Sequence, residues 1–235
     1  YKPIEYTKAL GVVTKATIEN LVAQIEILER ESDKKIKLTP VEPGQIATIA
    51  VAPGPGIARV FASLGVAGIV EGGQTMNPST QEILHSFENL PTDQIFILPN
   101  NKNIILAAQA AAQLTVKKVT VIPSKTVPQG MAALMRLAPD GEPERVAAEM
   151  IAALNDVETG EITVATRSVE IDDVTVQEGQ FIVLLNGKLV LSSASLKDAV
   201  LGFLEHAHAD HFELITLFYG ADMNRRDVDV IADLI

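Results

Sequence analysis

Four short apolar runs alternate with helix-type segments, and this alternation constrains the fold more than any other feature of the chain. Each run spans five or six residues, and the four runs lie at residues 46–51, 66–70, 94–99 and 118–123. Short apolar strands separated by helices are typical of a parallel sheet that is covered on both faces. The sequence therefore predicts an α/β fold whose first lobe contains a parallel sheet.

In the remainder of the chain, strands and helices no longer alternate one by one, and this change predicts a second lobe. Asn186-Gly187 lies between two apolar runs and is the strongest short hairpin signal in the sequence. Further strands are expected at 160–169 and 212–220, and helices at 127–137, 142–157, 195–207 and 225–235. Together these elements predict an α+β lobe with a mixed sheet. We expect the first lobe to span residues 46–130 and the second to span residues 131–235.

The amino-terminal residues predict a helix that does not belong to either lobe. Residues 14–31 carry apolar side chains at steps of three and four, namely Ile18, Leu21, Ile25 and Leu28. A charged segment that contains two prolines follows at 32–45 and reads as a linker. We therefore expect residues 1–31 to be the helical tail of an upstream, middle domain.

Composition excludes several classes of function. The net charge of -11 argues against a protein that binds nucleic acid through its phosphates, because such binding needs a basic face. No apolar run approaches the length of a membrane span. The absence of cysteine rules out disulfides and thiolate zinc sites and fits a reducing compartment, so we expect a cytoplasmic protein.

Two short motifs suggest chemistry that their context does not support. The glycine turn after residue 52 departs from the dinucleotide fingerprint, since Arg59 stands where its third glycine belongs. The string HAHADH resembles the metal site of metallo-β-lactamase-type hydrolases, and zinc would activate water there. It follows a helix-type segment, however, and no histidine lies downstream of it. A zinc hydrolase is therefore a remote alternative, and its ligands would be His206, His208, Asp210 and His211.

Three longer motifs together resemble one family. They are residues 71–80 (EGGQTMNPST), 98–103 (LPNNKN) and 122–130 (IPSKTVPQG), and the opening residues 6–24 add a fourth similarity. This sequence resembles the C-terminal region of the ATP-binding subunit of bacterial fatty acid kinase, a dihydroxyacetone-kinase-like (DAK2-domain) protein. The resemblance runs from about residue 5 to the end of the chain. It implies that the helical nucleotide-binding domain, together with its ATP and divalent metal, lies upstream of this chain.

The resemblance also implies a DegV-like fold for the two lobes. In DegV-type proteins, a Thr-Ser-x-Pro-Ser loop and a later Ser-Gly-Thr loop bind the carboxylate of a fatty acid. Thr75, Pro78 and Ser79 match the first loop, whereas an amide-rich segment at 100–104 replaces the second. That replacement weighs against fatty-acid binding. The candidate residues for a ligand or a partner are Gly72, Gly73, Thr75, Asn77, Ser79, Asn100, Asn101, Lys102 and Asn103.

The favoured hypothesis is a non-catalytic domain of a kinase subunit. The resemblance implies that the intact kinase forms acyl phosphate from ATP and a fatty acid carried by a separate DegV-type protein. This chain would dock that carrier beside the upstream domains, would need no cofactor of its own and would be inactive alone; a homodimer is a further possibility. The alternative is a domain that binds a small anion or a lipid head group through the loops at 72–79 and 100–104, whose glycines, hydroxyls and amides suit such ligands.

Overall fold

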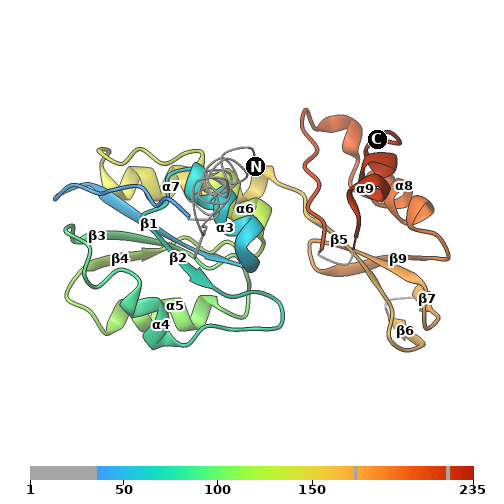
Figure 1. The fold of residues 1–235 in the computed structure, drawn as a ribbon, viewed down its shortest axis with the longest axis horizontal. Coiled ribbons are helices and arrows are strands. Elements are labelled where there is room, and N and C mark those ends of the chain that lie inside the picture. Colours follow the sequence, from blue (N-terminus) through green and yellow to red (C-terminus); the bar gives the residue numbers. More distant parts are fainter. Residues whose placement is uncertain (1–35, 172–173, 221–222) are drawn as a thin grey trace, which may run out of the picture. The chain divides into compact units, whose positions relative to one another are not determined.

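The computed structural model describes residues 36–171, 174–220 and 223–235 (Figure 1). The helix expected at 14–31, and with it the tail expected at 1–31, lies outside these residues. A compact unit begins at Leu38 and continues to Ile235. Within the described part of the chain, no helix has the length and apolar content to cross a membrane.

A four-stranded parallel sheet forms the centre of the first lobe, as the alternating pattern predicted. Its strands are β1 (Ile46–Ala52), β2 (Gly68–Glu71), β3 (Gln94–Leu98) and β4 (Lys118–Val121). They lie in the order β2-β1-β3-β4, and every neighbouring pair is parallel. All seven residues of β1 are buried because this strand has a neighbour on each side and helices over both faces.

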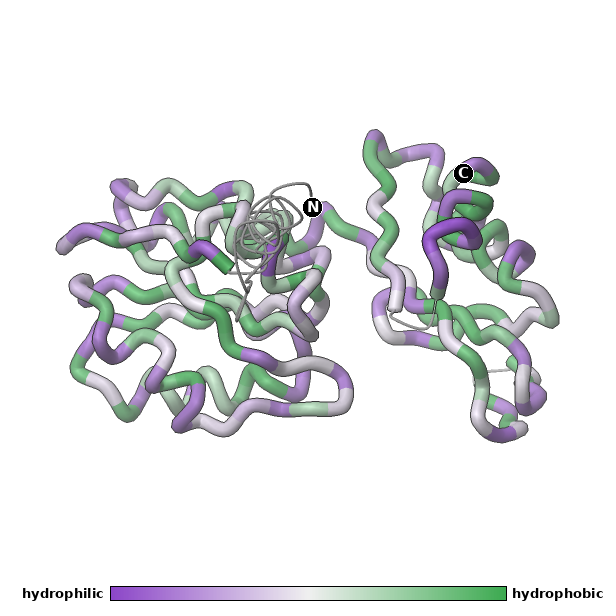
Figure 2. Tube along the Cα trace, in the orientation of Figure 1, coloured by the Kyte–Doolittle hydropathy of each residue, from purple (hydrophilic) through white to green (hydrophobic). Residues whose placement is uncertain are grey.

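Helices cover both faces of this sheet. One face is covered by α3 (Gly54–Ser63), α6 (Val127–Leu134) and α7 (Pro143–Ala153), with the short helix η1 (Leu154–Asp156) after α7. The other is covered by α4 (Thr80–His85) and α5 (Ile105–Gln113). Their apolar side chains meet those of the strands, which are among the most hydrophobic segments of the chain (Figure 2).

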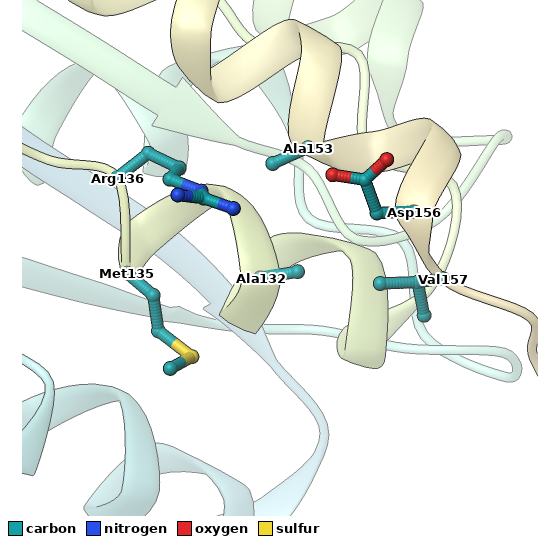
Figure 3. Close-up of a pocket in the computed structure, with 6 residues that line it drawn as sticks. All are labelled: Ala132, Met135, Arg136, Ala153, Asp156 and Val157. Carbon is teal, nitrogen blue, oxygen red and sulfur yellow. The ribbon is translucent and has the colours of Figure 1, made fainter. Parts of the chain in front are cut away.

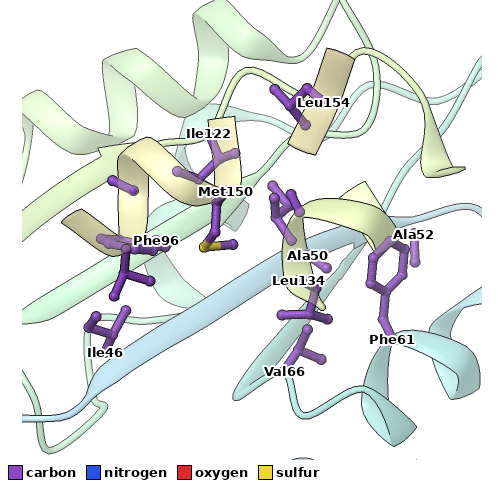
Figure 4. Close-up of a cluster of buried hydrophobic side chains, with 14 of the residues drawn as sticks. Ile46, Ala50, Ala52, Phe61, Val66, Phe96, Ile122, Leu134, Met150 and Leu154 are labelled. Carbon is purple, nitrogen blue, oxygen red and sulfur yellow. The ribbon is translucent and has the colours of Figure 1, made fainter. Parts of the chain in front are cut away.

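The two faces of β1 contribute to separate buried clusters. Ile46, Ala50 and Ala52 point to the face that holds Phe61 and Met150, as Figure 4 shows. The residues between them, Ala47, Ile49 and Val51, belong to the cluster on the opposite face. This alternation follows from the two-residue period of a strand, and it shows why a run with no polar alternation is a fully buried strand.

The expected boundary between residues 130 and 131 needs correction, because it falls inside α6. Leu134 of α6 and Val146 and Met150 of α7 lie in the same buried cluster as the sheet residues Ile46 and Phe96. The first lobe therefore extends through η1, and the second begins with β5.

In the part of the chain that the structure describes, the second lobe is built from antiparallel strands and helices. Strands β5 (Gly160–Val164), β8 (Phe181–Leu185) and β9 (Lys188–Ser193) form one sheet in the order β5-β8-β9, and β6 (Val169–Ile171) pairs with β7 (Val174–Val176). Asn186 and Gly187 join β8 to β9 with φ angles of 51° and 80°, which confirms the predicted hairpin. Helix α8 (Leu196–His206) begins at Ser195, whose hydroxyl accepts a hydrogen bond from the Asp198 amide, as expected of a capping residue.

One expectation for this lobe is wrong. Residues 212–220 form no strand; they follow the short helix η2 (Ala209–His211) and precede α9 (Arg225–Ala232), and each of them is exposed. Every strand pair described in this lobe is antiparallel. The β6–β7 pair was not predicted, since three-residue strands leave too short a pattern to detect.

Candidate functional site

The candidate loops follow β2 and β3 at the carboxyl edge of the parallel sheet, where open α/β sheets bind ligands. The strand order places β1 between β2 and β3, so the two loops are not on adjacent strands. The turn after β1, which contains Pro53, therefore lies between them. Three segments that are distant in sequence meet at this edge.

The glycines of the loop at 72–79 allow it to pack closely on the end of β1. The Gly72 amide donates to the Ala52 carbonyl at 3.1 Å. A Cβ at Gly72 would lie 2.7 Å from Pro78 Cδ, and a Cβ at Gly73 would lie 2.8 Å from Pro53 Cβ. These distances are below any ordinary carbon contact, so both positions require glycine. Their role in the structure is close packing of the loop.

Ser79 is the N-capping residue of α4 and is hydrogen-bonded to Glu82 of that helix. Its hydroxyl accepts from the Glu82 amide at 3.2 Å, while a Glu82 carboxylate oxygen accepts from the Ser79 amide and hydroxyl, each at 2.7 Å. This arrangement is a capping box. The hydrogen bonds from Ser79 stabilise the ionised carboxylate and lower the pKa of Glu82. A negative charge thus already occupies the start of α4, where the anion-binding alternative would place its ligand.

The middle of the same loop is exposed. Thr75 and Asn77 are both accessible, and Met76 between them has 49% of its surface exposed. The Gly73 amide donates to the Met76 carbonyl at 2.8 Å and closes the turn that presents these side chains. The loop therefore has a fixed base and an accessible tip.

Asn100 is built into the interior of the second loop. It is buried and has a φ angle of 56°, in the left-handed region that asparagine tolerates better than most residues. Its Nδ2 donates to the Val51 carbonyl at 2.8 Å, and its Oδ1 accepts from the Ser124 hydroxyl at 2.8 Å. The Asn100 amide donates to the same hydroxyl at 3.0 Å. One side chain thus joins the ends of β1, β3 and β4.

The rest of the second loop divides into a buried and an exposed part. Asn101 is buried, and its Oδ1 accepts from the Asn103 amide at 2.9 Å in a local turn. The side chains of Lys102 and Asn103 are exposed. The exposed residues of the two loops are therefore Gln74, Thr75, Met76, Asn77, Ser79, Lys102 and Asn103.

Two residues that complete this network were not among the predicted site residues. Ser124 is buried, and its hydroxyl both accepts from and donates to Asn100. Gly130 in α6 faces the Asn100 amide so closely that any Cβ there would collide with it. Both residues lie in the segment IPSKTVPQG, and the preceding strand at the carboxyl edge was the signal that could have identified Ser124.

The histidine string lies on the second lobe and is exposed. His206 Nδ1 lies 2.7 Å from the Gly202 carbonyl of its own helix, and His208 adopts a left-handed backbone with φ of 50°. The rings of His208 and His211 stack with centroids 6.0 Å apart, and His211 Nε2 lies 3.7 Å from Asp210. Among the described residues, no three such side chains converge in a way that would hold a metal ion. The geometry gives the zinc hydrolase alternative no support.

A shallow hollow of about 320 Å³ lies elsewhere on the first lobe, as Figure 3 shows. The residues that line it come from α6, the end of α7 and the segments just after these helices. None of them is a predicted site residue. They are Ala132, Met135, Arg136, Ala153, Asp156 and Val157. Two of these side chains carry opposite charges. The hollow provides no third group for acid–base chemistry.

Comparison with known proteins identifies relatives along nearly the whole chain. The FakA-like C-terminal family, named for the C-terminal part of a fatty acid kinase subunit, matches residues 47–235. Protein YloV of Bacillus subtilis is 37% identical over 227 residues, which cover 96% of this chain and 41% of that protein. An uncharacterized protein of Staphylococcus aureus, SAR1202, is 35% identical over 97% of this chain and 41% of its own length. The chain thus spans about two fifths of the length of these relatives.

Proposed function

The chain belongs to the FakA-like C-terminal family of fatty acid kinase domains, and from this membership we propose that it docks the fatty-acid carrier of the kinase. The carrier is a DegV-type protein, which presents the acyl carboxylate to the ATP-binding domain of the intact subunit. This domain holds the carrier in place and takes no part in phosphoryl transfer. The intact protein then forms acyl phosphate from ATP and the fatty acid.

One observation carries the proposal, namely the closed hydrogen-bond network around Asn100. In a carrier, polar groups at this edge of the sheet would be directed at a ligand. Here the polar atoms of Asn100 and Ser124 bind each other and the Val51 carbonyl, so they are already satisfied. These groups also cannot act as an acid or base at neutral pH, since amides and hydroxyls do not ionise there. The network supports a framework role.

The exposed residues of the two loops support docking at this edge. A rigid base under an accessible tip loses little conformational entropy when it binds a folded partner. Met76 supplies an adaptable apolar contact, and Lys102 supplies a positive charge within a chain whose net charge is strongly negative. We propose that both side chains contact the carrier.

The alternative, binding of a small anion or lipid head group at 72–79 and 100–104, has less support. The carboxylate of Glu82 accepts from the Ser79 amide and hydroxyl at the start of α4, and its negative charge would repel an anion placed there. Native mass spectrometry of the purified chain distinguishes the two functions. Docking predicts a bare chain, whereas a retained acyl lipid would favour the alternative.

The proposal is tested by binding measurements with loop variants. Met76→Asp and Lys102→Glu are each expected to weaken binding of the DegV-type protein by about tenfold or more, equivalent to about 1.4 kcal/mol. Lys188→Glu makes the same charge change on the second lobe, at the exposed end of a hairpin, and is the matched control. Equal affinities for all three variants and the unchanged chain would place the carrier elsewhere.

A further inference from the structure

The charged residues of this chain are distributed unevenly, and one stretch of the first lobe has no acidic residue. Of the 19 basic and 30 acidic residues in the chain, five basic and no acidic ones lie between 94 and 139. This stretch forms β3, α5, β4 and α6, and β3 and β4 are neighbours in the sheet. A strongly acidic chain therefore has one region of the opposite sign.

Helix α5 lies on the outside of this region and carries no charged residue (Figure 1). Its inner side is buried through Ala108 and Ala111. Leu106 has 76% of its surface exposed, and Leu114, which ends the helix about two turns later, has 64% exposed. The outer side of a surface helix normally carries charged or polar residues. Large apolar side chains that gather on the outer side instead mark an interaction surface.

Exposed apolar and basic side chains continue beyond both ends of α5. Lys102 precedes the helix and is exposed, whereas Val116 and Lys118 follow it. The Val116 side chain is fully exposed, at 102%, and Lys118 is the exposed first residue of β4. Among the described residues, neither lysine forms an ion pair with a carboxylate. We call Lys102, Leu106, Leu114, Val116 and Lys118 the α5 surface.

Acidic residues on this face of the sheet lie towards α4. Glu82 belongs to that helix, and Glu88 and Asp93 follow it before β3 begins. The Glu82 carboxylate is held at the start of α4 by hydrogen bonds from Ser79. From α5 to β4, which is the outer strand of the sheet, every charged side chain is basic. The β4 side of α5 thus presents only positive charges to an anionic surface.

The composition of the α5 surface fits a lipid bilayer better than a folded protein. Protein interfaces depend on tryptophan, tyrosine and arginine as anchors, and none of these residues lies between 97 and 135. Leucine and valine side chains flanked by lysines are typical of a segment that lies in a membrane interface. The lysine ammonium groups attract anionic head groups, while the lysine stems rest against apolar surface. Anionic lipid is therefore the occupant that matches both the charge and the apolar side chains.

We propose that the α5 surface binds the surface of an anionic membrane. Leu106, Leu114 and Val116 enter the boundary between head groups and acyl chains, and Lys102 and Lys118 contact the lipid phosphates. Membrane binding of this kind does not depend on docking of the carrier. If docking also holds, the membrane places this domain beside a source of fatty acid, because apolar acyl chains partition into bilayers.

Sedimentation of the whole chain with lipid vesicles tests the proposal. We expect binding to vesicles of phosphatidylglycerol and phosphatidylcholine in equal parts, and little binding to phosphatidylcholine alone. Binding should weaken in about 1 M salt, where the Debye length falls to about 3 Å. Lys118→Glu and Leu106→Gln should each weaken it by about fivefold or more. Lys188→Glu and Leu201→Gln make the same changes at exposed positions of the second lobe and should leave binding unchanged.

A fluorescent label gives an independent readout of position, because the chain has no cysteine of its own. An environment-sensitive fluorophore on Leu106→Cys should shift its emission to shorter wavelength when anionic vesicles are added. The same label on Leu201→Cys, in α8, should not respond. Both side chains are exposed, so the midpoint of thermal unfolding should be unchanged in each variant.

Several results would overturn membrane binding by the α5 surface. A folded chain that does not bind anionic vesicles, or that binds neutral vesicles equally well, is one. Full vesicle binding by both Lys118→Glu and Leu106→Gln is another, as is a label that responds at position 201 and not at 106. If Leu106→Gln weakens carrier binding in solution while the unchanged chain ignores vesicles, the α5 surface is a protein contact instead. Carrier binding without vesicles tests the docking function separately.

Discussion

The Nδ2 atom of Asn100 donates a hydrogen bond to the carbonyl oxygen of Val51 at 2.8 Å, and this contact joins the loop after β3 to the end of β1. The same amide accepts from Ser124, so one uncharged side chain links three neighbouring strands where a ligand site would otherwise open. The proposed docking function rests on that closure, because the polar groups at this edge of the sheet are bonded to one another.

Replacement of Asn100 should destabilise the fold strongly. Asn100→Ala removes two buried side-chain hydrogen bonds. It also places alanine, which has a Cβ but no polar group to hydrogen-bond the local backbone, at a φ angle of 56°. We expect a loss of about 2–4 kcal/mol in the free energy of unfolding by urea. Asn100→Gly loses the same hydrogen bonds but tolerates the backbone angle, so it should be less destabilised than Asn100→Ala. Equal losses would show that the backbone angle contributes nothing.

Gly130 should resist substitution because Asn100 occupies the space of any side chain. A Cβ at Gly130 would collide with the Asn100 amide, and we expect Gly130→Ala to cost at least about 2 kcal/mol of unfolding free energy. Gly56→Ala is the matched control: it also lies in a helix, and its added Cβ meets nothing within 4 Å. That control should be neutral or more stable, by up to about 1 kcal/mol. Equal effects of the two changes would contradict the tight contact.

Replacement of Thr48 by valine should raise the stability of the folded chain. Its hydroxyl is fully buried on β1 and has no hydrogen-bond partner, so removal of the hydroxyl at nearly constant shape should stabilise the chain by about 1 kcal/mol. Thr92 is equally buried, but its hydroxyl donates to the Gln45 carbonyl and accepts from the Gln94 amide. Thr92→Val should therefore destabilise. Chemical denaturation of both variants measures the two changes in unfolding free energy, which should have opposite signs. The same sign for both would contradict the unpaired state of the Thr48 hydroxyl.

The capping box at α4 should stabilise the fold only above acidic pH. Hydrogen bonds from Ser79 lower the pKa of Glu82 in the folded chain below its ordinary value of 4.5. The ionised carboxylate is therefore favoured by folding, and its contribution is present above pH 4.5 and lost as the pH falls through the folded pKa. We expect the difference in urea midpoint between wild type and Glu82→Gln to shrink from pH 7 to pH 3. Glu88→Gln, outside the capping box, provides the comparison, and a difference that grows on acidification would contradict the hydrogen-bonded carboxylate.

The parallel sheet was predictable because its two central strands, β1 and β3, are buried on both faces and so appear as nearly continuous apolar runs. The hairpin at Asn186-Gly187 was predictable from local chemistry alone, since both residues adopt positive φ angles. Residues 212–220 have the same local preference for a strand, yet no described strand pairs with them. A strand requires a partner, and local sequence does not specify one.

The position of the candidate loops at the edge of the sheet could be predicted from the sequence, but the hydrogen bonds within them could not. Gly72, Ser79 and Asn100 do lie at the carboxyl edge of the sheet, as the position of their loops implied. The contact between Asn100 and Ser124 joins residues 24 positions apart, and no periodic pattern encodes a contact at that separation. The role of Ser79 follows from its spacing to Glu82, a capping box that can be read from sequence. The roles of the exposed residues in docking remain proposals.

The central claim is tested most directly by calorimetric titration of this chain with the DegV-type fatty-acid carrier of the same organism, in the absence of ATP. The account predicts saturable binding with one carrier for each chain, and no release of phosphate when ATP is added to the complex. A folded chain that gives no binding heat at several temperatures, and no complex by sedimentation, would contradict it.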